Sequence, residues 1–386
     1  NNFASSSCLK MTGSSTSYST TIPAETNTAG ATITYYAFTP GNGTSISGAD
    51  ADLYTINLMN NSGSNYSYTV ASNFYSKSTG NIETLSNWGT SADGSGTAPV
   101  NFTTAGVTYN IRNNATPTIG ASWTVSGTSA KIVVGDGTNA CNFIVPSNYV
   151  VTSSNIEVSN AGKITRTSSA VNPFIVSGTF NILAGGTYVH NYANETLPFI
   201  IWASTANLNI DENLADDEFT ESFGNVNING NSTVRMMTTT GNSSNTIQGN
   251  LTINSTGVVV ATQTNTTNQT LTINGNLTVS SNSGSFYIES NSTSSNVTKK
   301  ILVLGSYIQT SGILNIASNT STLVGPNERI SILEVRGDFT QTGGSITESA
   351  TDSDYRCQIL LSKTSGIQYI ESIGNTTGLI EFNVAG

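Results

Sequence analysis

A short glycine-centred pattern recurs between residues 176 and 339, and this recurrence restricts the fold more than any other feature of the sequence. In five of the six copies an apolar residue stands two positions before a glycine, and in all of them apolar and polar residues alternate after it. The copies are VSGTFNI at 176–182, GNVNI at 224–228, IQGNLTI at 247–253, INGNLTV at 273–279, VLGSY at 303–307 and VRGDF at 335–339. Their glycines lie 46, 25, 26, 30 and 32 residues apart, and we treat the interval of 46 as two units.

A repeat of this length with short strands and polar turns is typical of a solenoid, in which each unit forms one coil. Alternate side chains of each strand then point into a continuous core, and glycine lets the backbone bend at the corners. Asparagine suits the corners as well, because stacked Asn side chains can hydrogen-bond along the axis. Ten to twelve coils would give a rod of roughly 50–60 Å. A tandem of β-sandwich domains is the alternative, since it also shows strands at short intervals.

The composition agrees with an all-β, extracellular protein. Half of the 386 residues are Ser, Thr, Asn or Gly, and only 9% are charged. Thirteen Lys and Arg residues against 23 Asp and Glu residues offer no basic surface for nucleic acid. No apolar run approaches the roughly 18 residues that a membrane span requires. We therefore expect a parallel β-helix, or β-solenoid, with no nucleic-acid partner and no membrane span.

The first part of the chain differs from the repeats and predicts a separate unit. Aromatic, alternating segments at 33–38, 53–58 and 66–75 are separated by Gly, Asn and Ser clusters, as in strands joined by turns. We expect residues 1–78 to form a small N-terminal β-subdomain or cap that can also contact another subunit. Residues 79–386 would then form the solenoid.

Several motifs near the start and the end of the solenoid carry a family resemblance. They are FYSKSTGN at 74–81, WGT at 88–90, DGSGTAP at 93–99, NFT at 101–103, YNIRN at 109–113, WTVSG at 123–127, VGDG at 134–137, QILL at 358–361, GIQ at 366–368 and IEFNV at 380–384. Residues 74–386 thus resemble the β-helical repeat regions of large secreted surface proteins of Bacteroidetes-type bacteria. The resemblance implies export by the type IX secretion system and a role as an adhesin or cell-surface fibre. It supplies no shared catalytic residues.

One acidic segment is the main candidate for chemistry. Six carboxylates fall within eleven residues of a chain that has 23: Asp211, Glu212, Asp216, Asp217, Glu218 and Glu221. Calcium takes six to eight oxygen ligands, so a loop here can supply several of them. A solvated acidic loop between coils and a catalytic carboxylate pair are the alternatives. A calcium site at 211–221 would accompany a second possible function, a carbohydrate-binding or polysaccharide-degrading β-helix.

The sequence otherwise argues against an enzyme. His190 is the single histidine, and no Gly-x-Ser-x-Gly elbow is present, so a Ser-His-Asp triad has little support. We expect His190 to be a surface or corner residue. Trp88, Trp123 and Trp202 show no spacing typical of a sugar-binding platform, and we expect them in the core or the cap.

Two kinds of covalent modification are compatible with the sequence. Asn-x-Ser/Thr occurs 17 times, an excess over chance that the composition almost explains. Glycans would still suit a surface so poor in charge. The candidate positions are Asn42, Asn65, Asn114, Asn194, Asn250, Asn276 and Asn375. Of the three cysteines, Cys8 and Cys141 can form one disulfide, with buried, unpaired thiols as the alternative.

The leading functional expectation is an extracellular structural or adhesive protein of the cell surface. The solenoid would serve as a rigid stalk or as the subunit of a fibre. The open ends of a solenoid carry unpaired strand edges, and an N-terminal strand segment can cap its own rod or pair with the next subunit by strand addition. Neither reading requires a cofactor other than the possible calcium ion.

Overall fold

The fold is described from a computed structural model of the chain. The structure describes residues 72–146, 148–167, 173–193, 195–216, 219–237, 244–262, 267–280, 284–289, 297–318, 329–350 and 355–385, together with Ser62 and short strands nearer the N-terminus. Those strands and their flanking residues lie at 11–14, 17–20, 32–35, 37–40, 56–59 and 66–69.

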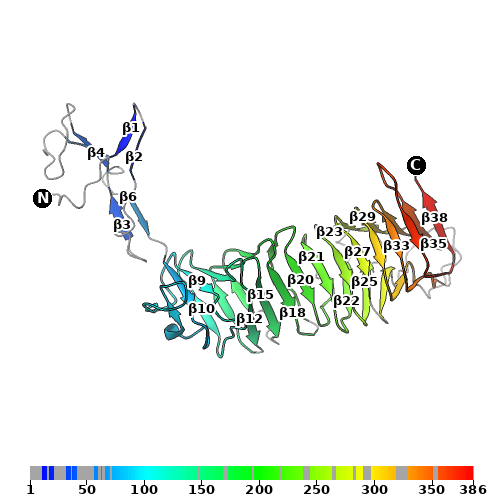
Figure 1. The fold of residues 1–386 in the computed structure, drawn as a ribbon, viewed down its shortest axis with the longest axis horizontal. Coiled ribbons are helices and arrows are strands. Elements are labelled where there is room, and N and C mark those ends of the chain that lie inside the picture. The colour runs from blue at the N-terminus through cyan, green and yellow to red at the C-terminus, as the bar shows by residue number, and fades with distance from the viewer. Residues whose placement is uncertain are drawn as a thin grey trace.

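The repeat region is a parallel β-solenoid, as the glycine pattern predicts. Figure 1 shows its strands stacked side by side along one axis, with the chain advancing from one end of the rod to the other. One ten-stranded parallel sheet runs along the rod and contributes one strand to each coil from residue 141 onward. Its strands are β12 (Cys141–Pro146), β15 (Gly162–Thr167), β18 (Thr187–His190), β20 (Asn207–Ile210), β21 (Asn225–Ile228), β24 (Leu251–Ile253), β27 (Leu277–Val279), β30 (Tyr307–Gln309), β33 (Phe339–Gln341) and β36 (Ile370–Ser372).

In the first half of the rod, the coils that contain β12 and β15 continue from this sheet into a three-stranded and then a seven-stranded sheet, whereas the coil that contains β18 passes directly to the seven-stranded sheet. The three-stranded sheet comprises β10 (Trp123–Val125), β13 (Val151–Ser153) and β16 (Phe174–Val176). The seven-stranded sheet comprises β7 (Asn73–Ser76), β8 (Trp88–Gly89), β9 (Thr108–Ile111), β11 (Lys131–Val134), β14 (Asn155–Val158), β17 (Phe180–Ile182) and β19 (Ile201–Trp202). A 3₁₀ turn, η4 (Leu85–Asn87), precedes β8.

In the second half, two six-stranded parallel sheets take the corresponding places in the coil. The first, the β22–β37 sheet, comprises β22 (Val234–Met237), β25 (Val258–Thr262), β28 (Ser285–Glu289), β31 (Ile313–Asn315), β34 (Ser345–Thr347) and β37 (Asn375–Thr377). The second, the β23–β38 sheet, comprises β23 (Ser244–Ile247), β26 (Gln269–Ile273), β29 (Thr298–Val303), β32 (Arg329–Val335), β35 (Tyr355–Leu361) and β38 (Ile380–Val384).

The core follows directly from the alternation in the sequence. Strands such as β12 and β29 alternate buried and half-exposed side chains along their length. The register of the strands then places apolar residues of successive coils next to one another. Leu251 lies beside Leu277, Leu277 beside Tyr307, and Tyr307 beside Phe339. All four of these side chains are fully buried. The apolar residues of successive coils therefore form continuous columns inside the rod.

The corner glycines are required because successive coils approach closely there. A Cβ built on Gly305 would lie 2.5 Å from the carbonyl oxygen of Gly275 and 2.5 Å from Asn276 Oδ1. Gly224 immediately precedes β21 of the ten-stranded sheet, whose first residue, Asn225, pairs with Asn207 of β20. Gly178 precedes β17 of a different sheet, so it does not belong to the same column as the later glycines. The interval of 46 residues therefore joins two different corners, which share the pattern because each precedes an alternating strand.

The first coil is closed by aromatic packing. Strand β8 pairs antiparallel with β7 at the edge of the seven-stranded sheet. The Trp88 and Trp123 rings stack with their centroids 5.7 Å apart, and both side chains are buried. The Phe102 ring meets that of Trp123 edge to face at 5.5 Å. These two tryptophans lie in the core, as expected, and Trp202 is also buried.

Among the residues that the structure describes before position 72, three antiparallel strand pairs precede the solenoid. They are β1 (Thr12–Ser14) with β2 (Ser17–Ser19), β3 (Thr32–Tyr35) with β6 (Tyr66–Thr69), and β4 (Ala37–Pro40) with β5 (Ile56–Met59). Figure 1 shows them beyond the first coil. Strand β7 lies before the expected boundary at residue 78, yet it pairs in parallel with β9 of the solenoid. The division at residue 78 stays a prediction.

None of the described residues forms a helix of the length and hydropathy that crossing a membrane would need.

Candidate functional site

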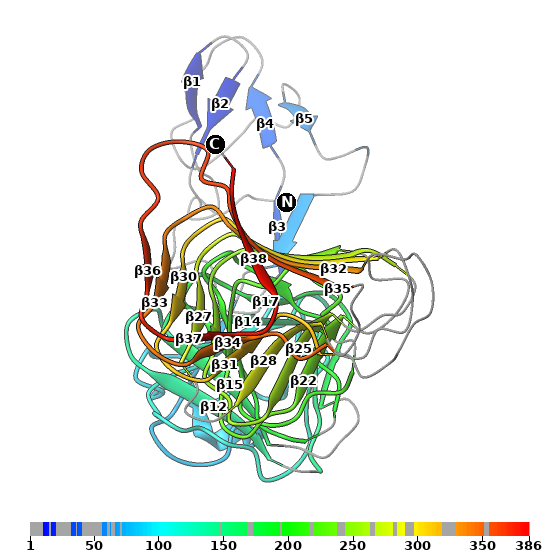
Figure 2. The same cartoon turned by 90° about the vertical axis from the view of Figure 1, so that its right-hand side faces the viewer.

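The last coil presents the largest group of exposed apolar side chains on the described part of the chain. Seven of the 17 large hydrophobic residues exposed there fall between residues 367 and 384. They are Ile367, Tyr369, Ile370, Ile373, Leu379, Phe382 and Val384. Figure 2 views the rod from this end, with β36, β37 and β38 nearest the viewer. Because apolar residues that gather in one patch often mark an interface, this coil is the first candidate for a functional surface.

The register explains why these side chains are exposed. Phe382 lies beside Ile359, and Ile370 lies beside Phe339, in the same columns that are buried in the preceding coils. Ile359 and Phe339 are fully buried, whereas Phe382 is 47% and Ile370 53% exposed. The Phe382 ring also meets Phe339 edge to face at 6.4 Å. Phe382 and Ile370 thus occupy core columns that are exposed in this coil, whereas Ile373 and Leu379 follow outward positions of the preceding coil.

The strand edges of this coil are open as well. Strands β36, β37 and β38 are each the last member of their sheet and pair with a neighbouring strand on one side. Their other edges can accept hydrogen bonds from a parallel strand. The first coil differs, because β8 covers part of its edge and tryptophans fill its interior. The two ends of the rod therefore present different chemistry.

The acidic segment does not gather its carboxylates in the described structure. Asp211 Oδ1 accepts a hydrogen bond from Asn229 Nδ2 at 2.9 Å, and Asp216 pairs with Arg235 at 3.2 Å. Glu221 Oε2 accepts a hydrogen bond at 3.2 Å from Nε1 of Trp202, which belongs to β19. Among the residues that the structure describes, no three His, Cys, Asp or Glu side chains lie together as a metal site would require. Glu212 is exposed, and Asp217 and Glu218 lie outside the described residues, so calcium binding stays a prediction.

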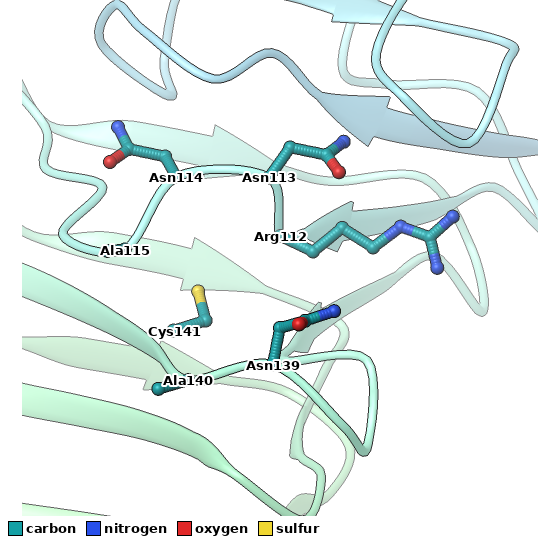
Figure 3. Close-up of a pocket in the computed structure, with 7 residues that line it drawn as sticks. All are labelled: Arg112, Asn113, Asn114, Ala115, Asn139, Ala140 and Cys141. Atoms are coloured by element: carbon teal, nitrogen blue, oxygen red, sulfur yellow. The ribbon is translucent and has the colours of Figure 1, made fainter.

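A pocket of about 210 Å³ lies on the surface between two coils near the start of the rod (Figure 3). Arg112, Asn113 and Asn114 line one side, and Asn139, Ala140 and Cys141 line the other. Burial raises the pKa of the Cys141 thiol to about 11, so it is not a ready nucleophile. Nearby Asp136 has its pKa lowered to about 2 by hydrogen bonds from Asn139 and Thr138, which fix a turn. The pocket offers polar contacts but no reactive group.

No family model, curated protein or solved structure matches this chain.

The expectation that His190 lies at the surface or at a corner is wrong. His190 is the last residue of β18 and is fully buried, in register with Arg166 of β15. Burial, followed by the positive charge of Arg166, lowers the pKa of His190 to about 4. Arg166 is buried too, and donates to the carbonyl oxygen of Thr196 at 2.6 Å and pairs with Glu195 at 3.6 Å. The histidine is therefore neutral at pH 7 and belongs to the interior.

The predicted asparagine ladder is present on the outer face. Asn225 Oδ1 accepts from the backbone N–H of Asn250, and Asn250 Oδ1 accepts from that of Asn276. Asn276 Oδ1 accepts in turn from the N–H of Ser306 at 2.8 Å. These side chains link one coil to the next, alongside the strand pairing.

The glycosylation candidates are partly visible. Asn250, Asn276 and Asn375 are exposed, and Asn114 is half-buried. Asn42, Asn65 and Asn194 lie outside the described residues. Glycosylation stays a prediction, although Asn250 and Asn276 already use their side-chain oxygens in the ladder.

The predicted disulfide is not seen. Cys141 is a free, buried thiol, as is Cys357, and Cys8 lies outside the described residues.

A group of buried polar side chains in the second half of the rod is not among the sites predicted from the sequence. Gln269, Glu289, Lys299 and Ser331 are all fully buried. The alternation would have found Lys299, because it occupies an inward position between Val297 and Ile301. A charged residue in an inward position is the signal to look for in such repeats.

Proposed function

We propose that this protein is an extracellular structural element of the cell surface, a rigid β-solenoid that works as a stalk or as the subunit of a fibre. The observation that carries the proposal is the unbroken ten-stranded parallel sheet over a continuous apolar core. Each coil is held to its neighbours by backbone pairing, side-chain columns and the asparagine ladder. Such a rod transmits force along its axis. In this proposal the function of the protein is mechanical and depends on the rigidity and length of the rod.

The extracellular location is supported by the composition and by the resemblance of residues 74–386 to secreted surface proteins. A surface with few charges and many Ser, Thr and Asn residues suits exposure outside the cell, with or without attached sugars. Export by the type IX route and glycans at exposed positions such as Asn375 belong to the same proposal.

The joint between subunits is the last coil. Its exposed apolar side chains and open strand edges suit a partner that adds strands in the same register. We place the strand-rich N-terminal segment of a second copy there. Head-to-tail contacts of this type do not close on themselves and therefore give filaments.

Labelling of intact cells of the source organism tests the location. An antibody against the solenoid should decorate the outside of unpermeabilised cells, and brief protease treatment of those cells should remove the signal. Labelling that appears only after permeabilisation would overturn the proposal.

A further inference from the structure

A buried amine, amide and carboxylate lie together in the second half of the rod. Lys299 of β29 lies beside Gln269 of β26 on one side and Ser331 of β32 on the other, in three successive coils. All three side chains are fully buried. Lys299 Nζ donates to Gln269 Oε1 at 2.9 Å and to the carbonyl oxygen of Thr267 at 2.8 Å. The amine therefore lies beside the carbonyl group of a side-chain amide.

The side-chain amide of Gln269 is also held in place through its nitrogen atom. Gln269 Nε2 donates to the carbonyl oxygen of Met237 at 3.1 Å, which fixes the plane of the amide and leaves Oε1 toward the lysine. An amine and a carbonyl group held at contact distance have a large advantage over the same groups free in solution. Neighbouring strands thus fix a pair of groups that can react with one another.

The carboxylate of Glu289 completes the group. Glu289 ends β28 and is fully buried, and its Oε2 accepts from Ser331 Oγ at 2.8 Å. Ser331 is the strand neighbour of Lys299, so this hydrogen bond places the carboxylate in the same part of the interior as the amine, where its charge acts on Lys299. Oε1 of Glu289 makes no hydrogen bond to any residue that the structure describes. Burial, followed by the charge of Glu289, raises the pKa of the Tyr355 hydroxyl, so this hydroxyl lies near the same carboxylate. A carboxylate in this position can take up and return a proton.

The environment also favours the reactive form of the amine. Burial lowers the pKa of Lys299 to about 8, while the negative charge of Glu289 acts in the opposite direction. A desolvated lysine of this kind is a better nucleophile at neutral pH than an exposed one.

We propose that Lys299 and Gln269 form an intramolecular isopeptide bond that ties two successive coils together, with Glu289 as the proton carrier. The unprotonated Nζ attacks Cδ of Gln269, so that the Nζ–Cδ bond forms and the Cδ–Nε2 bond breaks. Glu289 takes a proton from Nζ and delivers it to the departing nitrogen, which leaves as ammonia. The chain loses one ammonia molecule, and no oxidant, reductant or cofactor takes part.

The bond would strengthen the rod along its axis. Strands β26 and β29 are otherwise joined by hydrogen bonds and packing, which separate one after another under load. A covalent tie between coils prevents residues 269–299 from extending when the chain is pulled. This inference does not depend on the cellular location or on the joint between subunits.

Mass spectrometry of the folded, full-length chain tests the proposal directly. Under denaturing conditions the intact mass should fall below the sequence mass by one ammonia, and a protease digest should contain a branched peptide that joins Gln269 to Lys299. Lys299→Arg keeps the positive charge but lacks the nucleophile, and Glu289→Gln keeps the shape but cannot carry the proton. Both variants should show the full sequence mass and no branched peptide.

The adjacent residue supplies a matched control. Lys300 carries the same chemistry on the outer face, where it pairs with Glu334, so Lys300→Arg should retain the loss of ammonia. Asn-Gly pairs such as Asn274-Gly275 can also lose ammonia, and the branched peptide distinguishes the two reactions. Folded wild-type chain with its full sequence mass would overturn the proposal, as would a loss of ammonia without a branched peptide that joins Gln269 to Lys299.

Discussion

At the scale of single residues, the interior of this solenoid contains ionisable side chains, and residues of neighbouring coils accept hydrogen bonds from Arg166 and Lys299. The buried positions of Arg166, His190 and Lys299 all fall on inward sites of alternating strands. A buried ionisable group has a shifted pKa, and the shift couples the stability of the fold to pH.

His190 makes this coupling measurable, because it is the single histidine of the chain. Its pKa falls from 6.5 to about 4 on folding, so the unfolded chain binds the proton more tightly. The stability contributed by the neutral ring is complete above pH 6.5 and is lost as the pH falls toward 4. We expect the free energy of unfolding to be about 2 kcal/mol lower at pH 5 than at pH 7.

Urea titrations at the two pH values measure that difference. His190→Leu, which cannot take up a proton, should unfold with nearly the same free energy at pH 5 and pH 7. A wild-type chain without the pH dependence would contradict the assignment, and so would a variant that keeps it.

The corner glycines give a second prediction at this scale. Gly305→Ala would place a methyl group against the backbone of Gly275, which belongs to the preceding coil and cannot move away without breaking the strand register. We expect a loss of about 1–3 kcal/mol in the free energy of unfolding. Asn274→Ala, at the exposed position beside Gly275, is the control and should change the stability little. Equal effects of the two substitutions would contradict the close approach.

At the scale of strands and coils, stability depends on the columns of stacked side chains. Leu277 is fully buried in a column of the ten-stranded sheet, whereas Leu304, at a corner, is 38% exposed. Leu277→Ala should cost about 2–5 kcal/mol, because neighbouring coils are fixed by their own pairing and cannot collapse into the cavity. Leu304→Ala should cost well under half of that. Thermal unfolding of both variants makes the comparison, and similar losses would contradict the column model.

The sequence predicts much of this level of structure. Period-2 alternation after each glycine locates strands such as β24, β27 and β30, and the preference of Asn for corners anticipates the ladder through Asn250 and Asn276. The sequence pattern does not show which corner of the coil a glycine occupies. It therefore groups Gly178, which precedes a strand of the seven-stranded sheet, with glycines that precede strands of the ten-stranded sheet. The corners of a solenoid share the same local sequence pattern. Only the strand pairing between coils distinguishes one corner from another.

Candidate sites are harder to predict because they depend on contacts between coils. The acidic segment looks like a cluster in the sequence, but Asp211, Asp216 and Glu221 each contact a different partner in the structure. Conversely, Gln269 and Lys299 are 30 residues apart and meet because they are strand neighbours. Spacing along the chain therefore hides the pairs that the coil repeat brings together.

At the scale of the whole molecule, the asymmetry of the rod determines how copies can join. The aromatic end is closed, and the last coil exposes Ile373 and Leu379, which are 72% and 83% exposed. We expect the double substitution Ile373→Ser and Leu379→Ser to weaken self-association without changing the fold. Phe199→Ser, at a site 78% exposed along the side of the rod, is the matched control. Sedimentation velocity compares the wild-type chain, the double variant and the control. Equal self-association of all three would contradict a role of the last coil in the contact between subunits.

Electron microscopy of the purified chain, with and without residues 1–30, tests the central claim most directly. The full-length chain should form filaments in which the solenoid axis lies along the fibre, with a spacing of about 4.8 Å between stacked strands. The truncated chain should remain a folded single rod, because the solenoid strands begin at β7. Filaments that persist unchanged after truncation would contradict the account, as would a full-length chain that remains a single rod at every concentration.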